Sequence, residues 1–348
     1  MKFLRCKKPQ PNTGKTVGII GAGPAGLGAA GILRCKGHDV VVYDMLPEAG
    51  GMMFFGIPEE RIKKDKIRQA VRELMDAGVK FVFNTKVGKD VPLELLISTH
   101  DAVLIATGTW KTSRMNVPGE DLPWVIPAAE WLVDVHLALH GYKPWSEVIM
   151  VGGNILVIGG GLTAADAVTV PLTYEQFKGR VRKLVLSYRR TRKYAPMRET
   201  EMNRLEKLGA EIWELTQPIE FREEGGKKIV TFIRLELREA GAGKRPRPVP
   251  IPGSEFERTF DWVFKAIGVS PTPPFEDKCC GIELNPDGTI KTDDNFMTTR
   301  PGVFAAGDVR HGASLIGPAL KSGLDAAEKI HLYLTGQLKP ARVEEIRV

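Results

Sequence analysis

Two glycine-rich turns constrain the fold of this chain more than any other feature. The first lies in "TVGIIGAGPAGLGAA" (16–30) and the second in "NILVIGGGLTAADA" (154–167). In both, a short apolar run typical of a buried strand leads through the glycines into a helical pattern. Such a turn presents free backbone N–H groups and the positive end of a helix, which together bind the pyrophosphate of a dinucleotide. The sequence therefore predicts two dinucleotide-binding βαβ units in one polypeptide.

The first turn has the G-x-G-x-x-G spacing at Gly21, Gly23 and Gly26. The first glycine permits a tight turn out of the strand, the second lets the pyrophosphate approach the backbone, and the third lets the helix pack closely on the strand. Asp44 ends the next strand, 23 residues after Gly21, where a carboxylate can accept hydrogen bonds from an adenosine ribose. Together these features favour a dinucleotide site over an ordinary glycine-rich β–α turn.

The second turn has the spacing G-x-G-x-x-A at Gly159, Gly161 and Ala164. The strand that follows ends with Arg189 and Arg190, where an NAD site usually carries an acidic residue. Paired guanidinium groups suit a ribose 2′-phosphate through parallel charge-assisted hydrogen bonds. We therefore predict NADPH rather than NADH; the alternative is that both arginines are solvated residues at the end of a strand.

The rest of the chain alternates strand and helix patterns at both ends and is strand-rich after residue 211. Strands are expected at 16–21, 39–44, 101–108, 183–191, 227–240 and 258–268, and helices at 24–37, 128–141 and 317–336. Such alternation predicts parallel sheets with right-handed crossovers. The expected fold class is α/β, with two Rossmann-like, three-layer domains. Residues 1–111 and 271–348 form an outer domain, and residues 112–270 form a second dinucleotide-binding domain inserted into it.

Composition indicates a globular protein. Hydrophobic residues make up 43% of the 348 residues, which is enough for a buried core. The sequence has no apolar run long enough to cross a bilayer, and its first fifteen residues lack the apolar centre of a secretory signal. We expect a cytoplasmic protein that does not insert into a membrane.

The formal net charge of +7 comes from dispersed basic residues, with clusters at 189–193 and 243–248. A basic surface can steer an acidic protein partner toward the chain. Single-stranded nucleic-acid sites interleave basic with aromatic residues, and the sequence does not show that pattern. The charge therefore predicts an acidic protein partner rather than a nucleic acid.

Four cysteines occur in the sequence: Cys6, Cys35, Cys279 and Cys280. They form no C-x-x-C motif, and their spacing does not suit an iron–sulfur cluster. We expect all four to be structural or incidental, with no disulfide scaffold and no metal site.

The two turns, taken with several other motifs, resemble the small (β) subunit of NADPH-dependent glutamate synthase and related two-dinucleotide flavoproteins. The resemblance rests on "GHDVVVYD", "AGGMMFFGIPEERI", "DAVLIATGT", "VPGEDLP", "VIGGGLTAADA", "YRRT", "VFAAGDV" and "GPALKSGLDAAEKI". It covers nearly the whole chain from Lys15. It implies an FAD-dependent NADPH oxidoreductase that passes hydride to FAD and electrons to a partner subunit or another acceptor.

The resemblance also implies which residues bind each cofactor. For FAD these are Gly21, Gly23, Pro24, Ala25, Gly26, Asp44, Gly51, Met52, Arg61, Val87, Thr107, Gly108, Gly307, Asp308, Ile316, Pro318 and Ala319. For NADPH they are Gly160, Gly161, Leu162, Thr163, Asp166, Arg189, Arg190 and Gly268. Hydride transfer between the two rings needs no side-chain acid or base, so the sequence nominates no catalytic residue.

The chain departs from that family in two respects. The family's small subunit carries an N-terminal iron–sulfur domain, which we do not expect in this sequence. Leu162 and Thr163 occupy the part of the second turn where the family usually has an asparagine. Electrons would then leave the flavin directly to an acceptor or through another polypeptide, within a homo- or hetero-oligomer.

Other functions remain open at this stage. A disulfide reductase would need a redox C-x-x-C motif, and a flavin-dependent amine or amino-acid oxidase or dehydrogenase would not need the second glycine turn. A non-catalytic, nucleotide-binding assembly subunit is the remaining alternative.

Overall fold

The chain forms two compact units in the computed structural model, which describes residues 2–239, 241, 245–276 and 280–338. Unit 1 comprises Met1–Phe55, Glu59–Trp110 and Ser270–Val348, and unit 2 comprises Gly56–Pro58 and Lys111–Val269. The sequence prediction divided the chain at 111/112 and 270/271, one residue further along in each case. It also assigned residues 56–58 to the outer domain, whereas these three residues cluster with unit 2.

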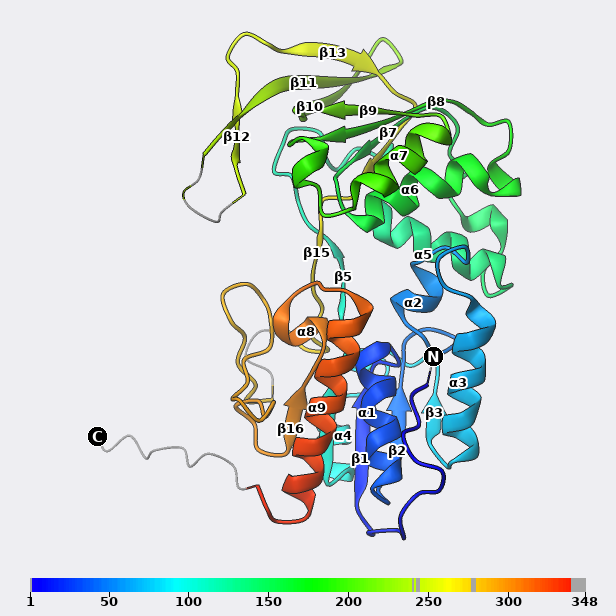
Figure 1. Ribbon diagram of the computed structural model, residues 1–348, viewed down its shortest axis with the longest axis vertical. Helices are drawn as coiled ribbons and strands as arrows, with labels where there is room; N and C mark the ends of the chain where they lie inside the picture. The colour runs from blue at the N-terminus through cyan, green and yellow to red at the C-terminus, as the bar shows by residue number, and fades with distance from the viewer. Residues whose placement is uncertain (1, 240, 242–244, 277–279, 339–348) are drawn as a thin grey trace. The chain divides into compact units, whose positions relative to one another are not determined.

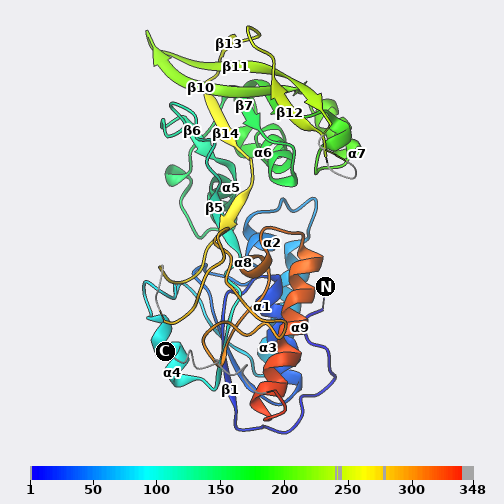
Figure 2. The same ribbon diagram turned by 90° about the vertical axis from the view of Figure 1, so that its left-hand side faces the viewer.

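Unit 1 is built on a five-stranded parallel sheet in the order β16-β4-β1-β2-β3. The strands are β1 (Thr16–Ile20), β2 (Asp39–Tyr43), β3 (Lys80–Val82), β4 (Ala102–Ile105) and β16 (Val303–Ala305). The helices are α1 (Pro24–Cys35), α2 (Met52–Phe55), α3 (Lys64–Asp76), α4 (Leu93–Thr99), α8 (Asp308–His311) and α9 (Ile316–Leu334). Figure 2 shows α1, α3 and α9 on one side of this sheet and α4 on the other. Because both faces are covered, β4 and β16 are buried throughout and consist of continuous apolar residues.

Helices α1 and α9 pack at backbone distance. A methyl group added to Gly323 of α9 would lie 2.0 Å from the carbonyl oxygen of Ala25 in α1. A methyl group on Gly28 would meet the side chain of Leu320 at 2.6 Å. Glycine at these positions therefore brings the C-terminal helix of the chain against the helix that follows the first glycine turn.

Two histidines, the buried His38 and the half-buried His331, connect the far ends of these two helices. The imidazole of His38 lies 2.7 Å from the hydroxyl of Thr13 and 2.9 Å from Nδ1 of His331 on α9. Burial, reinforced by the neighbouring His331, lowers the pKa of His38 to about 4. The pair is therefore neutral at neutral pH and links the segment before β1 to α9.

Unit 2 combines a parallel sheet with an antiparallel one. The parallel sheet has the order β6-β14-β7-β8-β9, and the antiparallel sheet the order β10-β11-β12, with β13 paired to β11. The parallel strands are β6 (Val125–Pro127), β7 (Gly153–Ile158), β8 (Val181–Tyr188), β9 (Ala210–Glu214) and β14 (Trp262–Lys265). The antiparallel strands are β10 (Thr216–Glu224), β11 (Lys227–Arg238), β12 (Arg247–Pro250) and β13 (Phe256–Thr259). Figure 1 shows the antiparallel sheet on one side of the parallel sheet and the helices α5 (Ala128–Leu139), α6 (Leu162–Thr173) and α7 (Glu199–Lys207) on the other.

Two short strands carry the chain between the units. These strands, β5 (Thr109–Thr112) and β15 (Val269–Pro271), pair with each other in a two-stranded sheet. The amide of Ser113 donates to the carbonyl of Gly268, and the amide of Thr272 donates to the carbonyl of Gly108. The entry to unit 2 and the exit from it are therefore neighbours.

These observations confirm the predicted α/β fold class with two parallel sheets. The boundaries of the elements shift by a few residues: the expected strand at 258–268 is divided into β13 and β14, which belong to different sheets. In the described part of the chain, the helices are all too short or too polar to cross a membrane.

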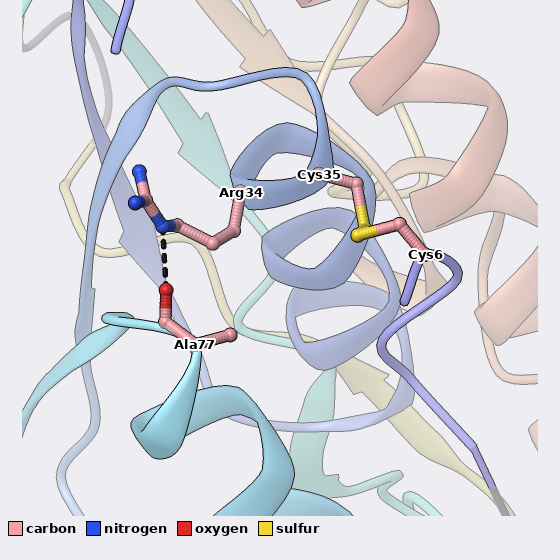
Figure 3. Close-up of a disulfide and its surroundings, with 4 residues drawn as sticks. All are labelled: Cys6, Arg34, Cys35 and Ala77. Atoms are coloured by element: carbon pink, nitrogen blue, oxygen red, sulfur yellow. Dashed lines mark hydrogen bonds between the residues drawn. A yellow bond between two sulfur atoms is a disulfide. The ribbon is translucent and has the colours of Figure 1, made fainter. Parts of the chain in front are cut away.

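The expectation that the cysteines form no disulfide is wrong. Cys6 and Cys35 are joined by a disulfide that ties the segment before β1 to the last turn of α1 (Figure 3). The amide of Gln10 donates to the carbonyl of Cys35, and Phe3 is buried. The N-terminal segment thus packs along α1, which brings Cys6 to its partner. Cys280 is also disulfide-bonded, and Cys279 lies outside the described residues.

Replacing both Cys6 and Cys35 by serine should lower the free energy of unfolding by roughly 3–4 kcal/mol, because the disulfide closes a loop between residues 29 positions apart. Urea denaturation of the wild type and the double variant, both without reductant, measures the difference. Omitting reductant keeps the disulfide of Cys280 intact in both proteins. An unchanged denaturation midpoint would show that the bridge does not stabilise unit 1.

Candidate functional site: two glycine turns

Backbone crowding fixes the first glycine turn. Gly21 follows β1 with φ of 108°, and a methyl group on it would lie 2.3 Å from the carbonyl oxygen of Ala106, just after β4. A methyl group on Gly26 would lie 1.9 Å from the carbonyl oxygen of Gly21. The first and third glycines of the motif are therefore required by the fold of unit 1 itself.

The middle glycine, Gly23, behaves differently. A methyl group on it would meet no atom within 4 Å, and its φ of −79° is open to any residue. Gly23 is the N-cap of α1, so the free N–H groups of the first helical turn follow it. Pro24 takes the first helical position, where its missing N–H costs nothing. The structure thus leaves space at the position where the motif requires backbone to approach a pyrophosphate.

Asp44, which directly follows β2, closes this turn from the adjacent strand. Its carboxylate accepts hydrogen bonds from the amides of Ala22, at 2.6 Å, and Leu46, at 2.8 Å. Burial raises the pKa of the Asp44 carboxyl to about 6, and the two amide donors only partly offset that effect. Burying a carboxylate is costly, and Asp44 lies within hydrogen-bonding distance of the glycine turn, where the sequence predicts a ribose.

A loop from the α2 region lies on the same turn. The amide of Gly50 donates to the carbonyl of Ala22, and a methyl group on Gly51 would lie 3.0 Å from the Cα of Gly23. The sequence did not single out Lys64, a buried lysine that donates to the carbonyl of Met53 in α2 at 2.8 Å. Lysine is usually exposed and Lys64 belongs to no motif, so the sequence gives no signal of this contact.

Another glycine turn of unit 1, at Gly307 before α8, also reaches α1. A methyl group on Gly307 would lie 2.8 Å from Cβ of Ala25, and the amide of Gly307 donates to the buried hydroxyl of Ser322 on α9. Ser314 donates to the carboxylate of Asp308 at 2.6 Å. Ser322 and Ser314 were missed by the sequence analysis, because serine in a helix or loop is common and carries no motif.

The other predicted FAD residues lie in three settings. Ile316, Pro318 and Ala319 form the first turn of α9; Met52 begins α2, with Arg61 exposed beyond it; Thr107 and Gly108 separate β4 from β5. Thr107 donates to the carbonyl of Thr272. Val87 is only 5% exposed and packs in the apolar cluster that includes Ile20 and Ile105, so its backbone rather than its side chain is available to a ligand.

The second glycine turn, in unit 2, repeats the geometry of the first. A methyl group on Gly159 would lie 2.2 Å from the carbonyl oxygen of Ala266, just after β14, and one on Gly160 would lie 2.3 Å from the ring of Tyr188. A methyl group on Gly161, the N-cap of α6, would meet no atom within 4 Å. The first and middle positions therefore behave alike in both turns, crowded at Gly21 and Gly159 and open at Gly23 and Gly161, whereas the third position accepts a methyl group in the second turn, where it is Ala164.

The remaining predicted NADPH residues divide between the turn and its flanks. Leu162 and Thr163 begin α6, and Gly268 lies between β14 and β15 with φ of 115°. Asp166 lies one turn into α6 and is only 3% exposed. Its side chain is therefore largely hidden from solvent.

Three arginines that follow β8 have different partners. Arg192 forms ion pairs with Glu206, at 3.0 Å, and Glu214, at 2.6 Å. Among the described residues, Arg189 and Arg190 have no carboxylate within ion-pair distance. Arg190 donates through Nε to the carbonyl of Pro246 at 3.0 Å, which leaves its terminal NH₂ groups without a protein acceptor in the same part of the chain. Both residues lie just beyond the strand, which ends at Tyr188 rather than at 191.

The described residues contain no group of three or more histidine, cysteine, aspartate or glutamate side chains arranged to hold a metal ion. The predicted ligand sites in this part of the chain are the two glycine turns.

Comparison with known proteins places this geometry in context. The model of the pyridine nucleotide-disulphide oxidoreductase family matches residues 15–323. The chain is 37% identical over 341 residues to the small chain of NADPH glutamate synthase from Azospirillum brasilense, over 95% of this chain and 69% of that protein. It is 38% identical over 339 residues to the beta subunit of an NADP(+)-dependent formate dehydrogenase from Moorella thermoacetica, over 96% of this chain and 46% of that protein. The chain thus spans less than half the length of this second relative.

A solved structure has the same fold. FprA from Mycobacterium tuberculosis, determined in complex with NADPH, matches with a TM-score of 0.81 and 20% sequence identity, over 95% of this chain and 87% of that one. At 20% sequence identity this match shows a shared fold alone.

Substitutions at the open and at the crowded glycines should have different effects on the melting temperature. Gly23→Ala and Gly161→Ala should leave the melting temperature of the ligand-free protein nearly unchanged, because neither new methyl group meets a protein atom. Gly26→Ala should lower the melting temperature by at least about 5 °C, because its methyl group overlaps a carbonyl oxygen. Calorimetric melting of all three variants tests this.

The two tolerated variants should also differ in what they bind. Gly23→Ala should weaken FAD binding, and Gly161→Ala should weaken NADPH binding, each by at least about tenfold. Each variant serves as the control for the other. Loss of both ligands in either variant would contradict the assignment of one ligand to each turn.

Proposed function

The chain belongs to the pyridine nucleotide-disulphide oxidoreductase family, and we propose that it is the electron-input subunit of a larger enzyme, taking hydride from NADPH and passing electrons through FAD to a second polypeptide. The observation that carries this proposal is the repeated turn, open at Gly23 in unit 1 and at Gly161 in unit 2. An enzyme that used one dinucleotide would need only one such turn. A flavin-dependent amine oxidase would not use the second glycine turn.

We assign FAD to unit 1. Three of the residues predicted for FAD lie close to the first glycine turn or its helix: Gly51 approaches Gly23, Gly307 approaches α1, and Asp44 lies against Ala22. The carboxylate of Asp44 would accept from the adenosine ribose, and the free amides of α1 would hold the pyrophosphate. Bound FAD supplies the flavin ring that accepts a hydride at N5.

We assign NADPH to unit 2. The free amides at the start of α6 would hold its pyrophosphate, as those of α1 do in unit 1. Arg189 and Arg190 lack carboxylate partners among the described residues, whereas Arg192 is used in the fold. Unpaired guanidinium groups favour a nucleotide that carries a 2′-phosphate over one with a free ribose.

The Cys6–Cys35 disulfide does not suit a redox role in the reduction of a disulfide substrate, although the family's name includes that activity. Cys6–Cys35 is attached to the last residue of α1, whereas the glycine turn lies at the first. A helix of 12 residues separates the two ends by roughly 17 Å. The disulfide therefore lies far from the turn that holds the cofactor and acts as a structural bridge.

The electron acceptor is proposed to be another protein. Two relatives are named as a small chain of glutamate synthase and a beta subunit of formate dehydrogenase, which are components of larger assemblies. The formal net charge of +7 favours an acidic acceptor, because opposite charge speeds association. Glutamate synthesis itself would require the partner subunit that carries that chemistry.

The raised pKa of Asp44, about 6 in the free protein, makes FAD affinity depend on pH. Ribose hydroxyls that donate to the carboxylate would favour its ionised form, so binding should be strongest above pH 6 and should weaken as the pH falls through 6 and Asp44 takes up a proton. Titration of apoprotein with FAD between pH 5 and 8, followed by flavin fluorescence, measures this. Asp44→Asn should flatten the profile, and the same slope in that variant would assign the effect to another group.

The nucleotide assignment is tested by flavin reduction. Anaerobic mixing with NADPH should bleach the flavin absorbance much faster than mixing with NADH. The double variant Arg189→Gln/Arg190→Gln should bleach about tenfold or more slowly with subsaturating NADPH. Its rate of bleaching with NADH should be nearly unchanged. Arg182→Gln, at the amino end of the same strand, is the control. Bleaching by neither nucleotide would exclude the oxidoreductase function, and faster bleaching by NADH would exclude the role of the arginines.

A further inference from the structure

Unit 2 carries a second pair of unpaired arginines. Arg245 and Arg247 lie at the start of β12, are exposed, and have no carboxylate within ion-pair distance among the described residues. Two other arginines of the same antiparallel sheet are paired with carboxylates, whereas Arg234 and Arg258 have no carboxylate within ion-pair distance among the described residues. Arg238 pairs with Glu236 at 2.7 Å, and Arg222 pairs with Glu257 at 2.7 Å.

A single hydrogen bond joins this pair to the arginines after β8. Nε of Arg190 donates to the carbonyl oxygen of Pro246 at 3.0 Å, and Pro246 lies between Arg245 and Arg247. Because consecutive Cα atoms are about 3.8 Å apart, the two flanking arginines start within one residue of the atom that Arg190 binds. Two segments 56 residues apart in sequence thus bring the backbone of Arg245 and Arg247 next to the guanidinium group of Arg190.

The backbone holds this arrangement. The amide of Leu215 donates to the carbonyl of Arg190 at 3.4 Å, and the carbonyl of Leu215 accepts from the amide of Leu235 in β11 at 2.9 Å. Leu215 has φ of 53°, a left-handed conformation that costs a branched residue free energy. The main chain of Arg190 is thereby connected to the same hairpin whose other strand carries Arg247.

Gathering like charges without counter-ions is unfavourable unless an anion joins them. The carbonyl of Pro246 engages only Nε of Arg190, so the terminal NH₂ groups remain for such an anion. A ribose 2′-phosphate carries close to two negative charges at neutral pH, and it is the anion that the adjoining glycine turn would bring there.

We infer that Arg245 and Arg247, on the β11–β12 hairpin, are specificity-determining residues that bind the 2′-phosphate of NADPH together with Arg189 and Arg190. The inference rests on the proposed function of unit 2 as the NADPH-binding unit. Selectivity for the phosphorylated nucleotide then depends on two segments that no single motif contains.

Calorimetric titration of the flavin-loaded full chain with 2′,5′-ADP and with 5′-AMP tests this inference. Arg245→Gln and Arg247→Gln should each weaken 2′,5′-ADP binding by about three- to tenfold and leave 5′-AMP binding within about twofold. The double variant should also show a shallower dependence of 2′,5′-ADP affinity on salt concentration, because fewer charges contact the phosphate.

Arg258→Gln is the matched control, because it removes the same charge from an exposed position. Arg258 lies on β13, which pairs with the end of β11 opposite to the end that pairs with Arg247. It should change neither affinity by more than about twofold. Unchanged 2′,5′-ADP binding in the Arg245/Arg247 double variant would overturn the inference while leaving NADPH as the donor. Equal loss of 2′,5′-ADP and 5′-AMP would also overturn it. If the wild type binds both ligands equally, the assignment of NADPH itself fails, and the inference fails with it.

Discussion

The close crossing of two backbone segments at each glycine turn is the constraint on which the rest of the structure depends. Gly21 passes the carbonyl of Ala106, and Gly159 passes the carbonyl of Ala266, each at a distance that excludes a side chain. In both units the opposing carbonyl belongs to the residue just after the neighbouring strand, β4 in one and β14 in the other. This crowding forces the chain into a tight turn, after which the glycine at the helix N-cap, Gly23 or Gly161, has no protein atom over it. One steric requirement, met twice, thus generates two anion-binding edges.

Unit 1 keeps an unfavourable group at one of these edges. Asp44 could be replaced by an apolar residue without loss of strand pairing, yet its carboxylate is buried and its pKa raised by that burial. The amides of Ala22 and Leu46 hold it in place but do not restore what water would have provided. A ligand that donates further hydrogen bonds to this carboxylate would offset part of the cost of burying it.

Local features of the sequence predicted the local part of the site. The glycine spacing, the apolar strands and Asp44 are encoded within one βαβ segment, so their proximity follows from secondary structure alone. Ser322, the Cys6–Cys35 bridge and the contact of Arg190 with Pro246 join segments far apart in the chain, and no periodicity reports them. The division of 258–268 into two strands has the same origin: Phe256 pairs with β11, whereas Trp262 pairs with β7 in the other sheet. The boundary between β13 and β14 is therefore set by which strand each pairs with, and not by the strand propensity of residues 258–268.

The adjacency of β5 and β15 has a consequence for biosynthesis. Unit 1 is translated in two separate parts. Its edge strand β16 and its covering helix α9 are translated only after residues 111–269 of unit 2. The sheet of the first part ends with β4 exposed along the edge that β16 later occupies. Unit 2, continuous from residue 111 to 269 apart from three residues, can complete its own core in the meantime. The edge of β4 therefore has no partner strand in this sheet until β16 has been translated.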